Sequence, residues 1–142
     1  MTCFFQCRHA SPWLIDPLWL PSFLVQRFAE DVVAPRVEQM DEAEKMDSAI
    51  IKGLFEQGLM AIETDPEHGG AGGSFTSAII VIEELAKIDP SVSVLCDVHN
   101  TLVNTVIRKY ASKELQDKYL PPLSTDTVSL ALSATYFSFV CA

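Results

Sequence analysis

A glycine-rich loop is the first feature of the chain with a possible chemical role. Residues 67–73 read Glu-His-Gly-Gly-Ala-Gly-Gly and precede a helical pattern that begins at Ser74. Backbone amides of such a loop can hold a phosphate group at a helix N-terminus. The preceding segment, residues 62–65, is too short for the buried strand of a phosphate-binding loop, and Phe75 follows where lysine or threonine is usual. We therefore favour a tight entry into a buried helix, which glycine permits, with anion binding as the alternative.

The other titratable side chains do not form a catalytic pattern. Glu83 and Glu84 are adjacent, so on a helix they diverge by about 100° and cannot act as a facing acid and base. We expect them on the solvated face. His99 lies two and three residues after Asp97 and Cys96, a spacing that does not give a nucleophile, a base and an orienting group on one helix. The sequence predicts a partly buried structural histidine and no catalytic residue.

The amino-terminal Cys3, Cys7 and His9 offer at most three metal ligands in a segment without predicted structure, which is too few for a structural zinc site. No metal site is predicted. The chain has 4 cysteines, and their positions form no disulfide framework. Free thiols in a reducing compartment are expected.

The composition of the chain limits the classes of molecule that it is expected to bind. The chain has 142 residues, 49% of them hydrophobic, which suits one packed domain. It carries 19 acidic against 10 basic residues and a net charge of −9, so nucleic acid is not an expected partner. Charges and prolines interrupt every apolar run before it reaches the roughly 18 to 20 residues needed to span a bilayer. No secretory signal or mitochondrial transit peptide is recognisable at the N-terminus.

Hydrophobic periodicity predicts five or six helices between residues 24 and 122. The first carries Phe28 and is interrupted by Pro35, and the second is capped by Ser48 and ended by Gly58. A third begins at Ser74 and has apolar residues on nearly every face, which predicts a central buried helix. The remaining boundaries are a cap at Asp89 with Pro90, a possible division at Asn100, a cap at Ser112 and a stop at Pro121 and Pro122.

The carboxyl-terminal end differs from the rest of the chain. Residues 128–133 are short and uncharged, which allows a strand, and residues 127–142 contain no charged side chain. Such an apolar end needs a cover in a soluble domain. The predicted fold is therefore all-α, with one short truncated β-strand at the C-terminus.

Seven segments in order resemble one family, the flavin-dependent acyl-CoA dehydrogenases, and specifically their N-terminal helical domain in the short/branched-chain members. The segments are Phe28-Ala29-Glu30 with Ala34-Pro35, Gly53 to Met60, Pro66 to Gly72, Val81 to Lys87, Asp89-Pro90-Ser91, Asn100-Thr101-Leu102, and Lys118 to Pro121. The resemblance divides the chain into an unrelated N-terminal extension (1–24), the helical domain (25–127), and the start of a middle-domain strand with an apolar tail (128–142).

The resemblance implies an activity that the residues alone do not. Family members oxidise a short or branched acyl-CoA to the 2,3-enoyl-CoA: a carboxylate takes the α-proton, FAD accepts the β-hydride, and electrons pass to electron-transfer flavoprotein. Members mostly form homotetramers in the mitochondrial matrix. Without a recognisable transit peptide, a cytosolic location stays open for this chain.

The resemblance also assigns site residues. The helix through Asn100 lines the end of the acyl chain in the family, which assigns the substrate pocket to Val94, Leu95, Val98 and Leu102, with ordinary core packing as the alternative. Leu130, Leu132 and Ser133 match only the stem of the segment that contacts the flavin. The family's catalytic glutamate has no counterpart up to Ala142.

These departures predict that the chain is a truncated product that alone neither holds FAD nor turns over substrate. A second hypothesis is a helical interaction module that pairs with full-length dehydrogenase subunits or forms a homo-oligomer. An unstable fragment without function is the third.

Overall fold

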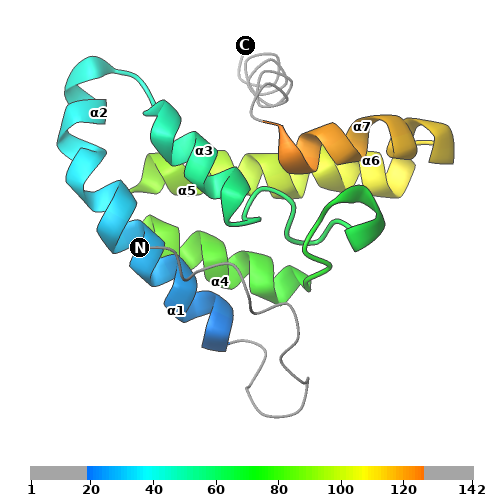
Figure 1. Cartoon of the computed structure of the whole chain (residues 1–142), viewed down its shortest axis with the longest axis horizontal. Coiled ribbons are helices and arrows are strands. Elements are labelled where there is room, and N and C mark those ends of the chain that lie inside the picture. Colours follow the sequence, from blue (N-terminus) through cyan, green and yellow to red (C-terminus); the bar gives the residue numbers. More distant parts are fainter. Residues whose placement is uncertain (1–18, 127–142) are drawn as a thin grey trace, which may run out of the picture.

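A computed structural model describes residues 19–126 of the chain. Within this range the structure has no strand, and its helices form five continuous runs (Figure 1). The all-α class with five or six helices is therefore confirmed. The runs are α1 (Trp19–Phe28) continued by η1 (Ala29–Val33), η2 (Ala34–Arg36) and α2 (Val37–Ala43); α3 (Ser48–Glu56); α4 (Phe75–Ala86); α5 (Pro90–Asp97) continued by η4 (Val98–Asn104) and α6 (Thr105–Tyr110); and α7 (Lys113–Thr125).

Several predictions fall outside the described residues. The strand expected at residues 128–133, its flavin-contacting residues Leu130, Leu132 and Ser133, and the cysteine pair Cys3 and Cys7 all belong to this group. For the described residues, no helix combines the length and apolar character needed to cross a membrane.

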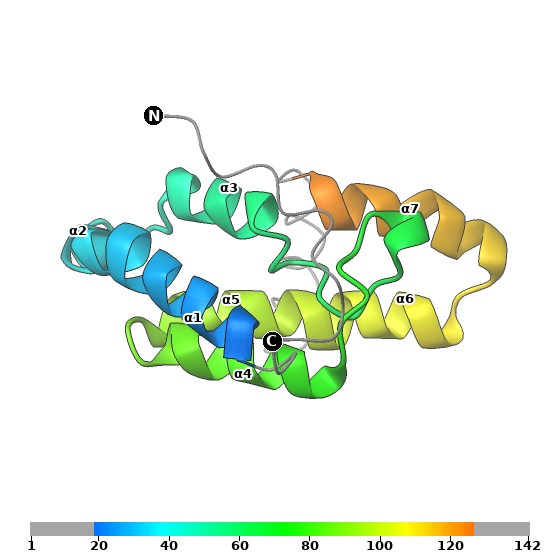
Figure 2. The same ribbon diagram turned by 60° about the horizontal axis from the view of Figure 1, so that its bottom comes forward.

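The helices are arranged around one hydrophobic core. Helix α4 and helix α5 form a hairpin, α1 packs against α4, and α7 lies beside α6 (Figures 1 and 2). The core is formed by α1, α3, α4 and α5 together with the segment that follows α3, and its fully buried members include Val33, Ile50, Leu54, Met60 and Leu85. The segment 57–73 crosses between these helices and contains a single 3₁₀ turn, η3 (Pro66–His68).

Local signals set the starts of α4 and α5 as expected, whereas Ser112 precedes α7 without forming a side-chain cap hydrogen bond. The Asp89 carboxylate accepts hydrogen bonds from the backbone N–H groups of Ser91 (2.6 Å) and Val92 (3.1 Å), with Pro90 as the first helical residue. Ser74 caps α4, and Gly58 follows α3 with a φ of +72°, a conformation that favours glycine. The cap of α3 is Asp47 rather than Ser48, because the Asp47 side chain accepts the bond from the Ala49 N–H.

The prolines interrupt the helices less than predicted. Before Pro35 the first helix widens into the π-helical segment η1, and after it the chain continues helically into α2. Helix α7 contains both Pro121 and Pro122, which were expected to end it. Two features hold this last turn: Leu120 and Leu123 are buried, and the hydroxyls of neighbouring residues donate to its carbonyls, Ser124 to Leu120 and Thr125 to Pro121.

Helix α4 corrects the expectation of a helix buried on all sides. Ala78, Val81 and Leu85 are buried, but Phe75 is 59% exposed and Ile79 is 42% exposed. The reason is that α1 and α5 cover only part of this helix. Its apolar outer face is uncovered in the described part of the chain.

Candidate functional site

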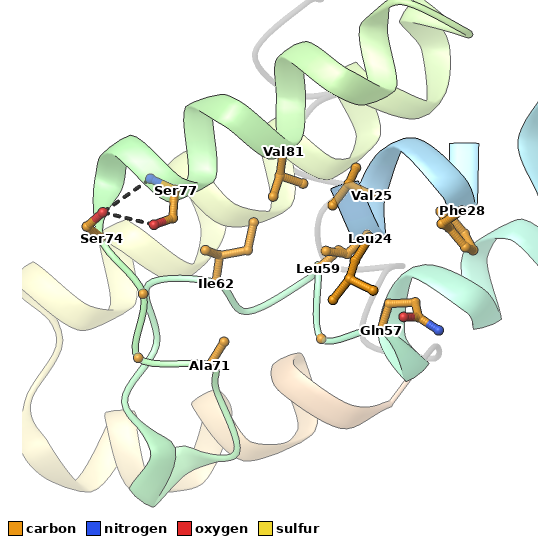
Figure 3. Close-up of a pocket in the computed structure, with 13 residues that line it drawn as sticks. Leu24, Val25, Phe28, Gln57, Leu59, Ile62, Ala71, Ser74, Ser77 and Val81 are labelled. Atoms are coloured by element: carbon orange, nitrogen blue, oxygen red, sulfur yellow. Dashed lines mark hydrogen bonds between the residues drawn. The ribbon is translucent and has the colours of Figure 1, made fainter. Parts of the chain in front are cut away.

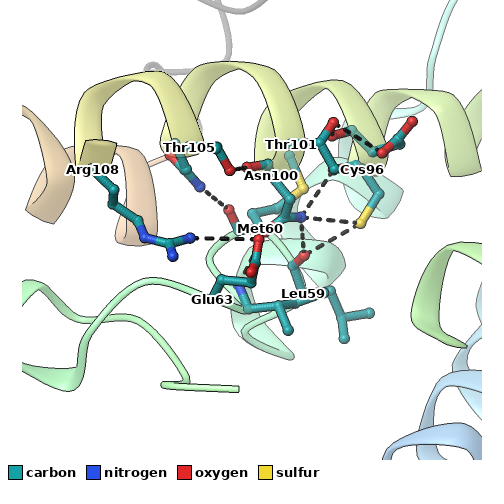
Figure 4. Close-up of polar contacts among 11 residues, drawn as sticks. Leu59, Met60, Glu63, Cys96, Asn100, Thr101, Thr105 and Arg108 are labelled. Carbon is teal, nitrogen blue, oxygen red and sulfur yellow. Dashed lines mark hydrogen bonds and ion pairs between the residues drawn. The ribbon is translucent and has the colours of Figure 1, made fainter. Parts of the chain in front are cut away.

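The centre of the molecule is a polar network between the helical run α5–η4–α6 and the segment that follows α3 (Figure 4). The Asn100 side chain accepts a hydrogen bond from the Ile62 N–H (3.0 Å) and donates to the carbonyls of Leu59 (2.8 Å) and Cys96 (2.9 Å). Four residues further, Asn104 donates to the Met60 carbonyl (2.8 Å). Both asparagines are buried, so these bonds satisfy backbone groups that water cannot reach.

The π-helical segment η4 carries this network without dividing the helix. Asn100 was expected as a possible break between two helices, but the run is continuous from Pro90 to Tyr110 and only widens from Val98 to Asn104. The Thr105 hydroxyl donates to the Asn100 carbonyl five residues before it (3.1 Å). A wide turn of this kind shifts the register of the helix faces and is common where a helix must place particular side chains.

The glycine-rich loop is built onto that segment by its own backbone. The N–H groups of residues 69 to 73 each donate to a carbonyl, and the last three bonds run from Ala71 to Ala61, from Gly72 to Thr64 and from Gly73 to Ile62 (2.7–2.9 Å). A Cβ atom on Gly70 would collide with the Thr64 carbonyl. Because the backbone N–H groups of residues 69–73 already donate to carbonyls, they are not free to bind an anion. The loop therefore forms a tight turn into α4, as expected.

The buried thiol and imidazole have structural surroundings. Burial raises the pKa of Cys96 to about 12, and its thiol donates to the Leu59 carbonyl (3.3 Å), so a reactive thiolate is disfavoured. Burial also lowers the pKa of His99, although its hydrogen bond to the Leu123 carbonyl (2.9 Å) acts in the opposite direction. The ring packs edge-on against Phe55. The expected structural histidine is found, fully buried and linking η4 to α7 and α3.

The two adjacent glutamates have different surroundings. Glu83 is exposed as expected. Glu84 is half-buried, and it accepts a hydrogen bond from Ser22 of α1 (2.9 Å) and pairs with Lys87 (2.9 Å). The hydrogen bonds from Lys87 and Ser22 lower its pKa despite the opposing effect of burial. Glu84 therefore joins α1 to α4 rather than lying on the solvated face.

The residues predicted to line the acyl pocket lie on two sides of α5 and η4. Val94 is 51% exposed, Leu102 is 41% exposed, and Val98 between them is half-buried. These three are spaced by four residues and form an outward-facing row. Leu95 is half-buried and packs against the hydrophobic core. Leu95 therefore contributes to core packing, and its assignment to the acyl pocket stays a prediction.

Two apolar hollows flank this region, and the sequence alone did not reveal them. One is a pocket of about 580 Å³ near the N-terminus of α4 (Figure 3). The other is a groove of about 370 Å³ between α6 and α7 that contains Leu102 and is lined further by Val103, Val106, Ile107, Ala111, Leu115, Tyr119 and Leu123. The one available signal for the groove was Val106, which continues the four-residue spacing of Val98 and Leu102. No three metal-ligating side chains converge anywhere in residues 19–126.

Comparison with known sequences gives consistent matches. The family model "Acyl-CoA dehydrogenase, N-terminal domain" matches residues 23–127. The chain is 52% identical over 105 residues to the mitochondrial short/branched chain specific acyl-CoA dehydrogenase of Bos taurus, and 47% identical over 102 residues to that of Rattus norvegicus. These matches cover 74% and 72% of this chain but 24% of each relative, so the chain spans about a quarter of their length.

A similar arrangement of helices occurs in a solved structure described as the electron transferring flavoprotein of Acidaminococcus fermentans. The match has a TM-score of 0.75 and 30% sequence identity, and it covers 83% of this chain and 31% of that chain. The likeness therefore extends over most of the described helices.

Proposed function

Because the chain belongs to the acyl-CoA dehydrogenase family, where it matches the N-terminal domain, we propose that it forms one wall of the acyl pocket in a flavin-dependent dehydrogenase for short or branched acyl-CoA. The names of the bovine and rat relatives support the substrate class. In this proposal the whole enzyme oxidises the acyl-CoA to the 2,3-enoyl-CoA and passes electrons through FAD to electron-transfer flavoprotein.

One observation carries the proposal: in the row Val94, Val98 and Leu102, the exposed members Val94 and Leu102 are apolar where a soluble helix is normally polar. An acyl chain is uncharged and would gain burial against such a row. The β-branched valines are stiff, so they would form a wall of fixed shape. Leu95, which packs inward, supports the wall from behind.

The two apolar hollows do not by themselves fit FAD. The cofactor carries a diphosphate, which needs cationic or free N–H donors, whereas the pocket near α4 and the groove beside α6 are lined without a charged side chain. Neither hollow contains an Asp or Glu that could act as base. The predicted flavin contacts Leu130, Leu132 and Ser133 lie outside the described residues, so we assign no catalytic step to residues 19–126.

A domain exchange tests the acyl wall. Residues 23–127 replace the matching part of the bovine enzyme, and the hybrid is assayed with butanoyl-CoA and 2-methylbutanoyl-CoA. We expect Val98→Phe to lower kcat/KM at least about tenfold for the branched substrate, and less for the straight one, because the added ring narrows the pocket. Ala86→Phe, the control, should change neither. If Val98→Phe leaves kcat/KM for both substrates unchanged relative to the unsubstituted hybrid, Val98 is not part of the wall.

The 142-residue chain is expected to be inactive alone. FAD and 2-methylbutanoyl-CoA are added anaerobically to the purified chain, and the flavin absorbance is followed. We expect no bleaching, because neither apolar hollow has a charged side chain that could pair with the FAD diphosphate or act as a base. Substrate-dependent bleaching would overturn this part of the proposal.

A second candidate is a helical interaction module that pairs with full-length dehydrogenase subunits or with itself. The exposed apolar side chains Phe75, Ile79 and Val106 favour it. Co-purification with a tagged bovine subunit should be lost in the Phe75→Ser, Ile79→Ser double variant. A monodisperse monomer that does not bind the subunit would count against it. The bovine and rat relatives are named as mitochondrial, and for this chain we propose the mitochondrial matrix as the location of either function.

A further inference from the structure

We infer that the pocket near the N-terminus of α4 binds a small, uncharged, apolar ligand at a site separate from the acyl wall. The pocket has a volume of about 580 Å³, within the range of roughly 300 to 1,000 Å³ typical of small-molecule sites. None of Val94, Val98 and Leu102 lines it. The inference therefore does not depend on the proposed dehydrogenase function.

Three segments that are distant in sequence form the pocket walls. Helix α1 supplies Leu24, Val25 and Phe28; the segment after α3 supplies Gln57, Gly58, Leu59 and Ile62; and the glycine loop with α4 supplies Ala71, Gly72, Gly73, Ser74, Ser77 and Val81 (Figure 3). The second and third walls are joined by the backbone bond from the Gly73 N–H to the Ile62 carbonyl (2.7 Å). Their spacing is thus fixed before a ligand arrives, which lowers the entropic cost of binding.

The side chains define the ligand chemistry. Every lining side chain is uncharged, so a carboxylate, phosphate or ammonium group on the ligand would lose hydration without a partner. At one end the Ser74 and Ser77 hydroxyls are 3.0 Å apart, and Ser74 also accepts from the Ser77 N–H (3.2 Å). A hydrogen bond between two hydroxyls uses one of their two protons. The other proton can be donated to a neutral acceptor on an otherwise apolar ligand.

The test uses N-phenyl-1-naphthylamine, a neutral apolar fluorophore, and the full 142-residue chain. We expect a saturable, one-to-one rise in fluorescence. Ala71→Phe should weaken binding at least about tenfold, because Ala71 lies on the pocket wall and its backbone N–H bond to Ala61 survives the substitution. Gln57→Phe repeats the test from the α3 side. Ala86→Phe, at an exposed position on α4 outside the pocket, should leave binding unchanged.

Three results would overturn the inference. The first is that the fluorophore does not bind saturably. The second is that Ala71→Phe and Gln57→Phe both fold and neither weakens binding. The third is that the fluorophore binds only after residues 1–18 are deleted. The last result would assign the pocket to the chain's own N-terminal segment. Thermal unfolding of each variant verifies that it is folded. Loss of activity in the domain-exchange hybrid leaves this result untouched, because the two sites share no residue.

Discussion

The two faces of the helical run Pro90–Tyr110 depart in part from the usual order of a soluble helix, because polar side chains are buried beside Val92 and Cys96 on one face and apolar side chains are exposed on the other. The inward face places Asn100, Asn104 and His99 in the interior, whereas the outward face presents Val94 and Leu102 to the surface. The Asn100 amide, the amide nitrogen of Asn104 and the His99 ring are hydrogen-bonded to backbone atoms of neighbouring segments. The inward face therefore stabilises the fold, whereas the outward face can contact another molecule or domain.

The largest expected effect comes from removing the inward amide. Asn100→Leu deprives the Ile62 N–H and the Leu59 carbonyl of the Asn100 bonds within the interior, so we expect a loss of about 3 kcal/mol or more in the free energy of unfolding. Urea denaturation measures it. Thr101→Val is the control, because the Thr101 hydroxyl bonds to Asp97 on its own helix, and it should cost under about 1 kcal/mol. If both variants lose the same free energy of unfolding, the Asn100 hydrogen bonds do not have the special role in stability proposed for the inward face.

The next effect tests how closely the glycine loop approaches the segment held by Asn100. In Gly70→Ala the added methyl group meets the Thr64 carbonyl, and we expect a cost of about 2 kcal/mol. Gly58→Ala meets no atom within 4 Å and strains only a positive φ, which costs about 1 kcal/mol. Differential scanning calorimetry of the two variants compares them. If Gly58→Ala lowers stability more than Gly70→Ala, the contact between Gly70 and the Thr64 carbonyl matters less than the positive φ of Gly58.

A matched pair of valines tests the difference between the buried and the exposed face of this helix. Val92 is fully buried and Val94 is 51% exposed on the same helix. Val92→Thr buries an additional hydroxyl and should cost about 2 kcal/mol, whereas Val94→Thr should change stability by under about 0.5 kcal/mol. Chemical denaturation of both variants gives the difference. Similar costs would show that Val94 is covered in solution.

The smallest effect is the pH dependence contributed by His99. Its pKa is lowered below the ordinary 6.5 by burial, so the unfolded chain binds a proton more readily than the folded chain. The stabilising contribution is complete above pH 6.5 and is lost as the pH falls below that value towards the pKa of the folded state. Unfolding at pH 7.5 and 5.5 measures it, and His99→Gln should reduce the slope. If His99→Gln leaves the change in the free energy of unfolding between pH 7.5 and 5.5 unaltered, groups other than His99 cause the pH dependence.

Much of the fold follows from local signals in the sequence. The Asp89-Pro90 start, the Ser74 cap and the left-handed Gly58 depend on atoms within a few residues, and each was found as predicted. Pro121 and Pro122 were not found as predicted. A proline removes one hydrogen bond, but the burial of Leu120 and Leu123 by distant helices outweighs it, and that burial is not visible in local sequence.

The candidate site was only partly visible in the sequence. The resemblance to the family assigned Val94, Val98 and Leu102 to the acyl pocket, and the structure shows that Val94 and Leu102 are exposed. Leu95 was included, although its neighbours turn it inward towards the core. The pocket near α4 was not anticipated, because its lining residues come from α1, the segment after α3 and the glycine loop, and no local pattern relates these three.

The sequence by itself determined the family and the starts of α4 and α5. Only the tertiary structure decided which apolar side chains are covered. Phe75 and Val81 are both apolar and lie on the same helix, yet one is exposed and the other is buried against the core. The physical reason is that hydrophobicity belongs to the residue, whereas burial depends on neighbours brought together from distant parts of the chain.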